Sequence, residues 1–321
     1  AEQVRFVSTG SEADMFAIRL ARAATGREAI VKFEGGYHGM SAEGQMSLAP
    51  QRLTNFPEAV PDSAGIPETV RHDVLVAPFN DVAFLESLLA ERGNDIAALI
   101  VEPFQRIIPP ERGFLESVRA LCDRYGIVLI FDEVVTGFRL AHGGAQELYG
   151  VTPDLCTLGK VIGGGFPLAA IAGKAALMAL FDKAAGERWL MQVGTLSGNP
   201  VAAAAGLKTL EILRRPGAYD IIRSNGRQIM EAMTAALSAE SVPHRIVGDP
   251  VLFDVVFTAA PVRQYRDVIG QDNAAAGRFN AALRPEGVLK PPGKVYVSAA
   301  LTETDLGQIA AASGVAARAA A

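Results

Sequence analysis

The chain has 321 residues, 50% of them hydrophobic and 20% charged, which is enough for about two domains with cores of their own. The net charge is −5, no cluster of basic residues is present and no apolar run is long enough to span a membrane, so neither a nucleic-acid-binding protein nor a membrane protein is expected. Two cysteines, Cys122 and Cys156, with no signal peptide and no metal-ligand spacing, indicate free thiols in a reducing, cytoplasmic compartment and no metal site.

The first two thirds of the chain alternate strand and helix patterns. Residues 4–9 predict a strand, and residues 11–25 predict a helix that ends at Gly26. The runs IAALIVEPF and GIVLIFDEVV are nearly all apolar, which is typical of parallel strands covered on both faces. DLCTLGK predicts another short strand. Asn199 as N-cap and Pro200 as first helical residue then begin an alanine-rich helix that runs to about Arg215.

The pattern changes after RRPGAYD. A helix over residues 220–240 is followed by the strand-like runs HRIVG and VLFDVVF, a helix, and KVYVSAAL. We therefore predict an α/β domain over residues 1–215, with a mostly parallel sheet between helices, and a smaller α+β domain over residues 216–321.

The segment STGSEA (Ser8–Ala13) lies between the first strand and the first helix. Gly10 allows a ligand to approach the backbone, and the amides of Ser11 and Glu12 are expected to be unpaired at the positive end of the helix dipole. A phosphate suits such a site. An ordinary helix cap with a capping carboxylate is the alternative.

Two glycine-rich turns offer further contacts to a ligand. In GGYHGM, Tyr37 could stack on an aromatic ring, or it could be a half-buried aromatic residue of a turn. In QVGTLSGNP, Gly194, Thr195 and Ser197 provide donors near a helix start, either for a second phosphate contact or within a polar turn.

The remaining candidate site residues are an acid and a lysine. Asp132 ends an apolar strand, at the edge where open α/β sheets bind ligands, and a buried carboxylate there needs a cation or several donors. Glu133 is expected on the other face, solvated or ion-paired. Lys160 follows a strand and is predicted to be a desolvated nucleophile that forms a Schiff base with an aldehyde, or else a surface lysine. A structural ion pair is the alternative for Asp132, with Arg139 as one possible partner.

One ligand accounts for all of these features together. Pyridoxal phosphate has a phosphate, an aromatic ring, a ring nitrogen that needs an acid partner and an aldehyde that needs an amine. The order of the motifs along the chain therefore indicates pyridoxal 5'-phosphate as the cofactor.

The chain also resembles the class III aminotransferases, which are pyridoxal-phosphate proteins of fold type I, and within them the glutamate-1-semialdehyde 2,1-aminomutase subgroup. The resemblance spans nearly the whole chain and is carried by STGSEA, GGYHG, VEPF, LIFDEVVTGFR, LGKVIGGGFPLAAIAG, GTLSGNPVAAAAGL and KVYVSAALTETD. It implies the PLP-transferase fold and a segment of chain before Ala1.

The resemblance assigns roles to residues of the pocket. It implies that Lys160 binds the cofactor aldehyde and later moves the proton, and that Asp132 pairs with the ring nitrogen. Val134 is implied to pack on one face of the ring and Tyr37 on the other. Glu102, which precedes a proline, is implied to lie on the substrate side.

The resemblance also implies a homodimer. Gly10 and Ser11 hold the phosphate, whereas Gly194 and Thr195 resemble the turn that reaches the phosphate of the neighbouring subunit's cofactor. No single arginine is assigned to a substrate carboxylate.

The implied reaction moves an amino group between an amino acid or amine and a keto acid or aldehyde. Two departures favour such an aminotransferase over an aminomutase: EPFQRI, with Ile107, stands where the aminomutases have EPVAGN, and GGGFPLAA stands where they have GGGLPVGA. The aminomutase remains the alternative among enzymes. A catalytically inactive subunit of the same fold is the alternative of another class.

Overall fold

A computed structural model describes residues 1–321, which form two compact units. Unit 1 comprises Ala1–Arg106 and Pro110–Leu213, and unit 2 comprises Ile107–Pro109 and Arg214–Ala321. No helix of the structure is both long and apolar enough to cross a membrane.

A seven-stranded sheet forms the centre of unit 1, in the order β1-β7-β6-β5-β4-β2-β3. Its strands are β1 (Gln3–Val7), β2 (Ala29–Phe33), β3 (Val74–Ala77), β4 (Ile96–Val101), β5 (Val128–Glu133), β6 (Leu155–Leu158) and β7 (Ala169–Gly173). Strand β7 alone runs opposite to the other six strands, so the predicted mostly parallel sheet is confirmed. The carboxyl ends of the other six strands and the beginning of β7 consequently lie along one edge.

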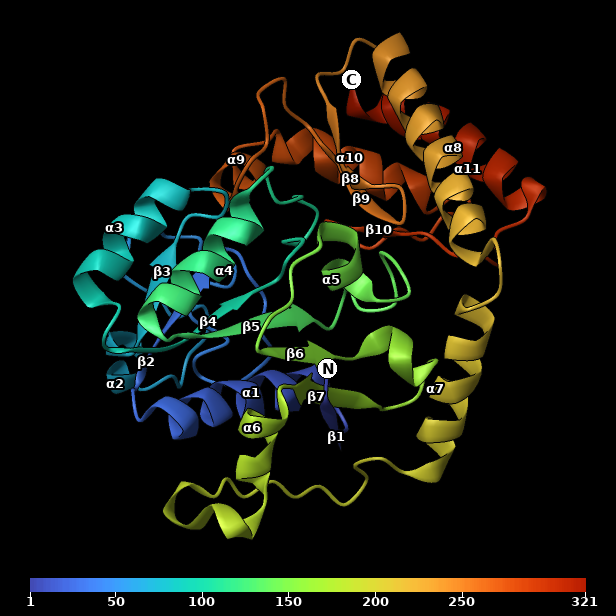
Figure 1. Cartoon of the computed structure of the whole chain (residues 1–321). Helices are drawn as coiled ribbons and strands as arrows, with labels where there is room; N and C mark the ends of the chain where they lie inside the picture. The colour runs from blue at the N-terminus through green and yellow to red at the C-terminus, as the bar shows by residue number, and fades with distance from the viewer. The chain divides into compact units, whose positions relative to one another are not determined.

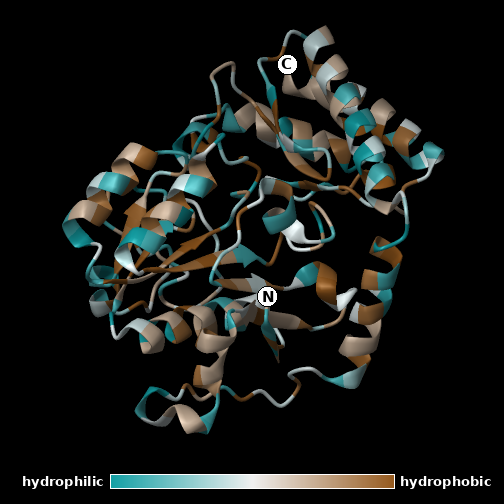
Figure 2. Cartoon of the chain, in the orientation of Figure 1, coloured by the Kyte–Doolittle hydropathy of each residue, from teal (hydrophilic) through white to brown (hydrophobic).

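Helices cover the sheet on both faces, with α1 on one side and α3 and α4 on the other (Figure 1). The helices of unit 1 are α1 (Gly10–Thr25), α2 (Glu68–His72), α3 (Val82–Arg92), α4 (Phe114–Tyr125), α5 (Gly144–Tyr149), α6 (Ala175–Met178) and α7 (Pro200–Leu213), with the short 3-10 helices η1 (Lys160–Gly163), η2 (Ala179–Phe181) and η3 (Lys183–Arg188). Every residue of β4 and β5 is buried, as expected for apolar strands covered on both faces, and Figure 2 shows these strands as largely hydrophobic.

The predicted start of α7 is confirmed in detail. The side-chain Oδ1 of Asn199 accepts a hydrogen bond from Ala202 N at 2.9 Å, and Pro200 is the first helical residue. The helix ends at Leu213, slightly before the predicted end. The short strands β3 and β7 were not predicted.

Unit 2 contains a three-stranded antiparallel sheet in the order β10-β9-β8 and four helices. Its elements are α8 (Ala218–Ala239), β8 (Arg245–Asp249), β9 (Leu252–Val256), α9 (Tyr265–Ile269), α10 (Asn273–Leu283), β10 (Val295–Tyr296) and α11 (Glu303–Ala320). This is the small α+β arrangement predicted for the C-terminal part of the chain.

Candidate active site

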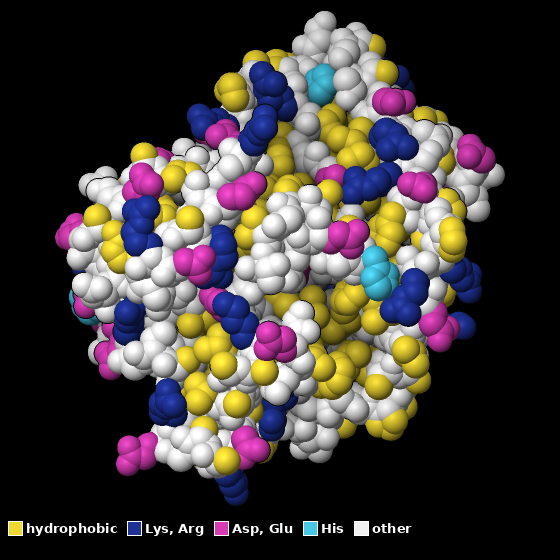
Figure 3. Space-filling view, in the orientation of Figure 1, with side chains coloured by type: hydrophobic (Ala, Val, Ile, Leu, Met, Phe, Trp, Pro, Cys, Tyr) yellow, Lys and Arg dark blue, Asp and Glu magenta, His cyan; other side chains and the backbone are white.

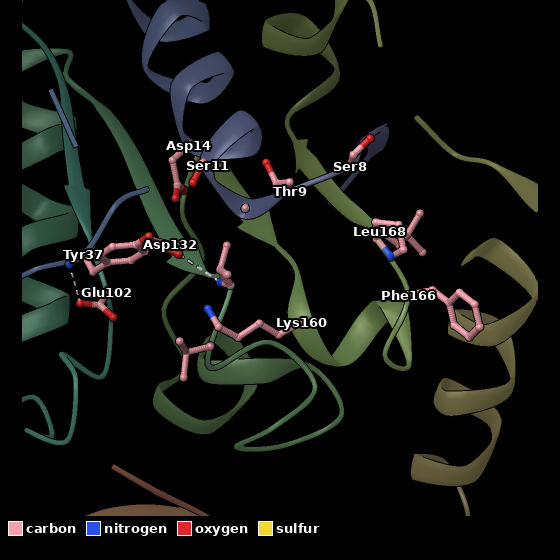
Figure 4. A pocket seen from close by; sticks show the side chains of 14 residues that line it. Ser8, Thr9, Ser11, Asp14, Tyr37, Glu102, Asp132, Lys160, Phe166 and Leu168 are labelled. Atoms are coloured by element: carbon pink, nitrogen blue, oxygen red, sulfur yellow. Dashed lines mark hydrogen bonds between the residues drawn. The ribbon is translucent and has the colours of Figure 1, made fainter. Parts of the chain in front are cut away.

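A pocket of about 210 Å³ opens at the carboxyl edge of the sheet in unit 1. It is lined by Ser8, Thr9, Gly10, Ser11, Asp14, Tyr37, Glu102, Asp132, Val134, Val135, Lys160, Phe166, Pro167 and Leu168 (Figure 4). These residues follow β1, β2, β4, β5 and β6 or precede β7, which explains why residues far apart in the sequence meet. The pocket brings together seven of the predicted site residues: Gly10, Ser11, Tyr37, Glu102, Asp132, Val134 and Lys160.

The beginning of α1 is both capped and open to a ligand. Thr9 and Glu12 form a capping box: Glu12 N donates to Thr9 Oγ1 at 3.2 Å, while Ser8 N and Thr9 N donate to Glu12 Oε2 at 2.9 and 2.8 Å. The prediction of an unpaired Glu12 amide is therefore wrong. The amides of Gly10 and Ser11 have no recorded protein acceptor, so they remain as the anion-binding donors at the positive helix end.

Gly10 is needed for close packing between this helix start and the loop after β5. A Cβ atom at position 10 would lie 2.8 Å from Val134 Cγ1 and 2.9 Å from Val134 Cγ2. Because carbon atoms normally stay 3.5–4.0 Å apart, a side chain at position 10 would push Val134 away. The glycine therefore fixes the place of Val134 in the pocket wall.

Glu102 holds the loop that carries Tyr37. The amide of Tyr37 donates to Glu102 Oε2 at 3.0 Å, and Glu102 is only 4% exposed (Figure 4). The guanidinium of Arg106 lies 5.4 Å from the centre of the Tyr37 ring and 3.9 Å from Glu102 Oε2. A backbone contact and a cation–π contact thus hold Tyr37 at the pocket.

Asp132 has a buried partner that the sequence interpretation missed. His38 Nδ1 lies 2.8 Å from Asp132 Oδ2, and the two side chains are 1% and 3% exposed. Since a carboxylate only accepts hydrogen bonds, Nδ1 is the donor of this pair. Val134 N donates to Asp132 Oδ1 at 3.1 Å. His38 follows β2, so the common strand edge was the signal that could have paired it with Asp132.

Glu133 is neither solvated nor ion-paired, contrary to expectation. It is 1% exposed and accepts hydrogen bonds from Thr136 Oγ1 at 3.0 Å, Ala145 N at 2.6 Å and Gln146 Nε2 at 2.8 Å. Burial raises the pKa of Glu133, and these donors oppose the rise. The residue fastens the turn after β5 and does not line the pocket.

Lys160 lies on the pocket wall in an uncommon backbone conformation. Its φ is 47°, in the left-handed region, where a residue with a Cβ is strained by roughly 1–2 kcal/mol. Its side chain is exposed and has no recorded hydrogen bond or ion pair, so the prediction of a desolvated lysine is wrong for this structure. Figure 4 shows its Nζ directed into the pocket, toward Asp132.

Gly194 and Thr195 do not reach this pocket. They line a separate hollow beside β1, together with Arg5, Gln192 and Ser197. Gly194 and Thr195 are exposed there.

A sheet of this topology with the pocket at its carboxyl edge is the arrangement of pyridoxal-phosphate proteins of fold type I, and the predicted fold is confirmed by the solved structures described next. The family model "Aminotransferase class-III" matches residues 1–305. The chain belongs to the class III aminotransferase family, as the sequence resemblance predicted.

Three relatives illustrate the range of the similarity. The chain is 42% identical over 318 residues to a glutamate-1-semialdehyde 2,1-aminomutase from Myxococcus xanthus (strain DK1622), covering 97% of this chain and 72% of that protein. It is similar to the structure of an omega-transaminase from Sphaerobacter thermophilus, with a TM-score of 0.92, 36% identity, and coverage of 99% and 74%. A transaminase solved with PLP bound gives a TM-score of 0.89 at 30% identity, covering 99% of this chain and 74% of that one.

Proposed function

We propose that the chain acts as a pyridoxal-phosphate-dependent aminotransferase that moves an amino group between an amino acid or amine and a keto acid or aldehyde. One observation carries the proposal: a lysine amine, a buried strand-end carboxylate and two helix-start amides line a single pocket. Membership of the class III family supports it.

The donor set of the pocket fits pyridoxal phosphate. The amides of Gly10 and Ser11 would hold the phosphate, and Asp132 would meet the ring nitrogen. Val134 and Tyr37 would cover the two faces of the ring. When bound, the cofactor supplies an aldehyde for the substrate amine and a protonated ring that stabilises negative charge at the substrate carbon.

The residues of the chain supply positioning and proton transfer. His38 and Val134 N donate to Asp132 and so fix the orientation of the carboxyl group that would meet the ring nitrogen. Lys160 Nζ is exposed in the pocket, where it can take a proton from the substrate carbon and deliver it to a second carbon. A positioned general base of this kind contributes about 10²–10⁴-fold to a rate.

An intramolecular aminomutase is the second candidate. The Myxococcus xanthus relative with that name is 42% identical, whereas the Sphaerobacter thermophilus structure is named as an omega-transaminase. The departures at EPFQRI and GGGFPLAA favour the aminotransferase. An inactive subunit is the less favoured reading, because the lysine, the aspartate and the helix-start amides are all in place.

A homodimer with a shared phosphate site is the quaternary structure we propose. Large apolar side chains are exposed around the hollow that contains Gly194 and Thr195: Val193 is 70% exposed, Leu196 59% and Val201 61%. Figure 3 shows hydrophobic side chains gathered over α7, which begins beside this segment. A second copy of the chain would cover this patch and receive Gly194 and Thr195 at its cofactor.

The experiment that tests the proposal starts from purified protein reconstituted with pyridoxal phosphate. We expect a visible absorbance that saturates with added cofactor and is lost in Lys160→Ala. A colourless wild type would contradict the proposal. Amino donors are then added singly: release of a keto product supports the aminotransferase, and isomerisation of the donor without a released product supports the aminomutase.

A further inference from the structure

Besides Asp132 and Glu102, a third carboxyl group lines the pocket and has no role in the function proposed above. Asp14 projects from the first turns of α1, is 2% exposed and lies next to Ser11 in Figure 4. An acid on the buried face of a helix requires a partner, because an isolated buried charge is costly. The recorded side-chain partner of Asp14 is Thr157 on β6.

Thr157 lies between the two acids. Its Oγ1 is 2.6 Å from Asp14 Oδ1 and 3.5 Å from Asp132 Oδ1, and the residue is completely buried. A threonine hydroxyl carries a single hydrogen and cannot donate to both carboxylates at once. Both contacts are hydrogen bonds only when one of the acids supplies the second hydrogen.

The surroundings decide which acid holds that hydrogen. Asp132 already has two donors, His38 Nδ1 on one oxygen and Val134 N on the other. The side-chain partner of Asp14 is the Thr157 hydroxyl alone. Burial, followed by the negative charges of Asp132 and Glu102, raises the pKa of Asp14 well above its usual value, although the hydrogen bond with Thr157 and the charge of Lys160 oppose the rise. Two carboxyl groups that share a buried site do not both ionise easily.

We propose that Asp14 is a positioning residue that keeps its proton and donates it to Thr157 Oγ1, which in turn donates to Asp132 Oδ1. Asp132 Oδ1 then faces the hydroxyl of Thr157 as well as Val134 N, and Asp14 adds no negative charge near the ring nitrogen of the cofactor. The effect on the cofactor rests on the proposed function. The protonation of Asp14 does not.

The first test therefore uses the cofactor-free protein. Infrared difference spectra between wild type and Asp14→Asn at pH 7 should contain the C=O band of a protonated carboxyl group, with a shift in D₂O. Aspartic acids in water are ionised at that pH, because their pKa is about 3.9. Absence of the band would overturn the proposal whether or not the protein binds pyridoxal phosphate.

The second test measures cofactor affinity in four variants. Asp14→Asn keeps a neutral donor to Thr157 and should bind pyridoxal phosphate within about twofold of wild type, as should Thr157→Ser, which keeps the hydroxyl. Asp14→Ala and Thr157→Val break the chain of hydrogen bonds and should each weaken binding about three- to tenfold, the usual effect of one lost hydrogen bond. A large change in the affinity for pyridoxal phosphate in Asp14→Asn would show that wild-type Asp14 is ionised, which would overturn the proposal.

A cofactor analogue with carbon in place of the ring nitrogen separates positioning from simple structural support. It cannot form the contact with Asp132, so Asp14→Ala and Thr157→Val should bind it as wild type does. If Asp14→Ala and Thr157→Val lose as much affinity for the analogue as for pyridoxal phosphate, the two residues only hold α1 against β6. A wild type that binds neither compound would refute the proposed function and leave the infrared result standing on its own.

Discussion

Substitution of Gly10 tests the packing of the pocket wall most directly. In Gly10→Ala the new Cβ would lie 2.8 and 2.9 Å from the two methyl carbons of Val134, so one of the residues has to move. Overpacking of this kind costs about 1–3 kcal/mol. Alanine in place of a helical glycine stabilises a helix interior by about 0.5–1 kcal/mol. The gain is smaller at the first helical position, which Gly10 occupies. A net loss of roughly 0.5–2 kcal/mol follows.

Two assays measure this loss. Urea unfolding of the cofactor-free protein reports the stability of the packing, and titration with pyridoxal phosphate reports the pocket. If Val134 is pushed into the pocket, the same free energy weakens cofactor binding about two- to thirtyfold. The matched control is Gly277→Ala in α10, where an added Cβ meets nothing within 4 Å. That change should stabilise the protein by up to about 1 kcal/mol without any effect on cofactor binding.

A double-mutant cycle isolates the contact. Val134→Ala removes the two methyl groups, so Gly10→Ala should cost much less in the Val134→Ala background than in wild type. The reasoning is refuted if Gly10→Ala stabilises the protein as much as Gly277→Ala does. It is also refuted if the cost of Gly10→Ala is the same in both backgrounds.

Two further predictions concern a buried charge and an exposed surface. Burial lowers the pKa of Lys32 to about 7 from 10.5, although Gly44 O and Met46 O accept from its Nζ. The unfolded chain therefore binds more protons between these pH values, and the free energy of unfolding should rise from pH 7 toward 10.5, by at most about 1.4 kcal/mol per pH unit. Urea unfolding at several pH values should show a smaller slope in Lys32→Met, and an unchanged slope would contradict the assignment. Val193→Asp should give a monomer in light scattering and weaker pyridoxal-phosphate binding in titration. The control Leu289→Asp, at a residue that is 78% exposed outside this patch, should change neither. A dimer that persists in Val193→Asp would count against the proposed interface.

The elements that could be predicted from the sequence are those with a strong local signal. Buried parallel strands such as β4 and β5 are apolar throughout, and the Asn199-Pro200 pair marks a helix start by its own chemistry. Strand β7, AAIAG, has a single β-branched residue and reads locally as helix or loop. It becomes a strand because β1 and β6 pair with it on both sides, a tertiary effect that overrides propensity.

The site residues likewise divide into those with a local signal in the sequence and those without one. Asp132 and Lys160 stand out because a charged residue at the end of an apolar strand is conspicuous. His38 and Thr157 are unremarkable in the sequence and gain their roles only from neighbours on other strands. Asp14 did carry a signal, since it lies on the same helical face as buried Ala17, Ile18 and Ala21, where an acid is unexpected.

The pairing of β1 with β7 has a consequence for how the pocket is made during synthesis. Residues 3–7 pair with residues 169–173 and with no other strand. Strand β1 therefore cannot pair until more than half of the chain has emerged from the ribosome. At usual translation rates that interval is on the order of 10–30 s. Such long-range pairing slows folding, because the entropy of the connecting chain is lost before the contacts form. Gly10 and Ser11 come directly after β1, whereas Lys160 lies just before β7. We therefore expect the pairing of β1 with β7, which fixes the strand just before the phosphate-binding amides, to be completed only after Lys160 has been synthesised.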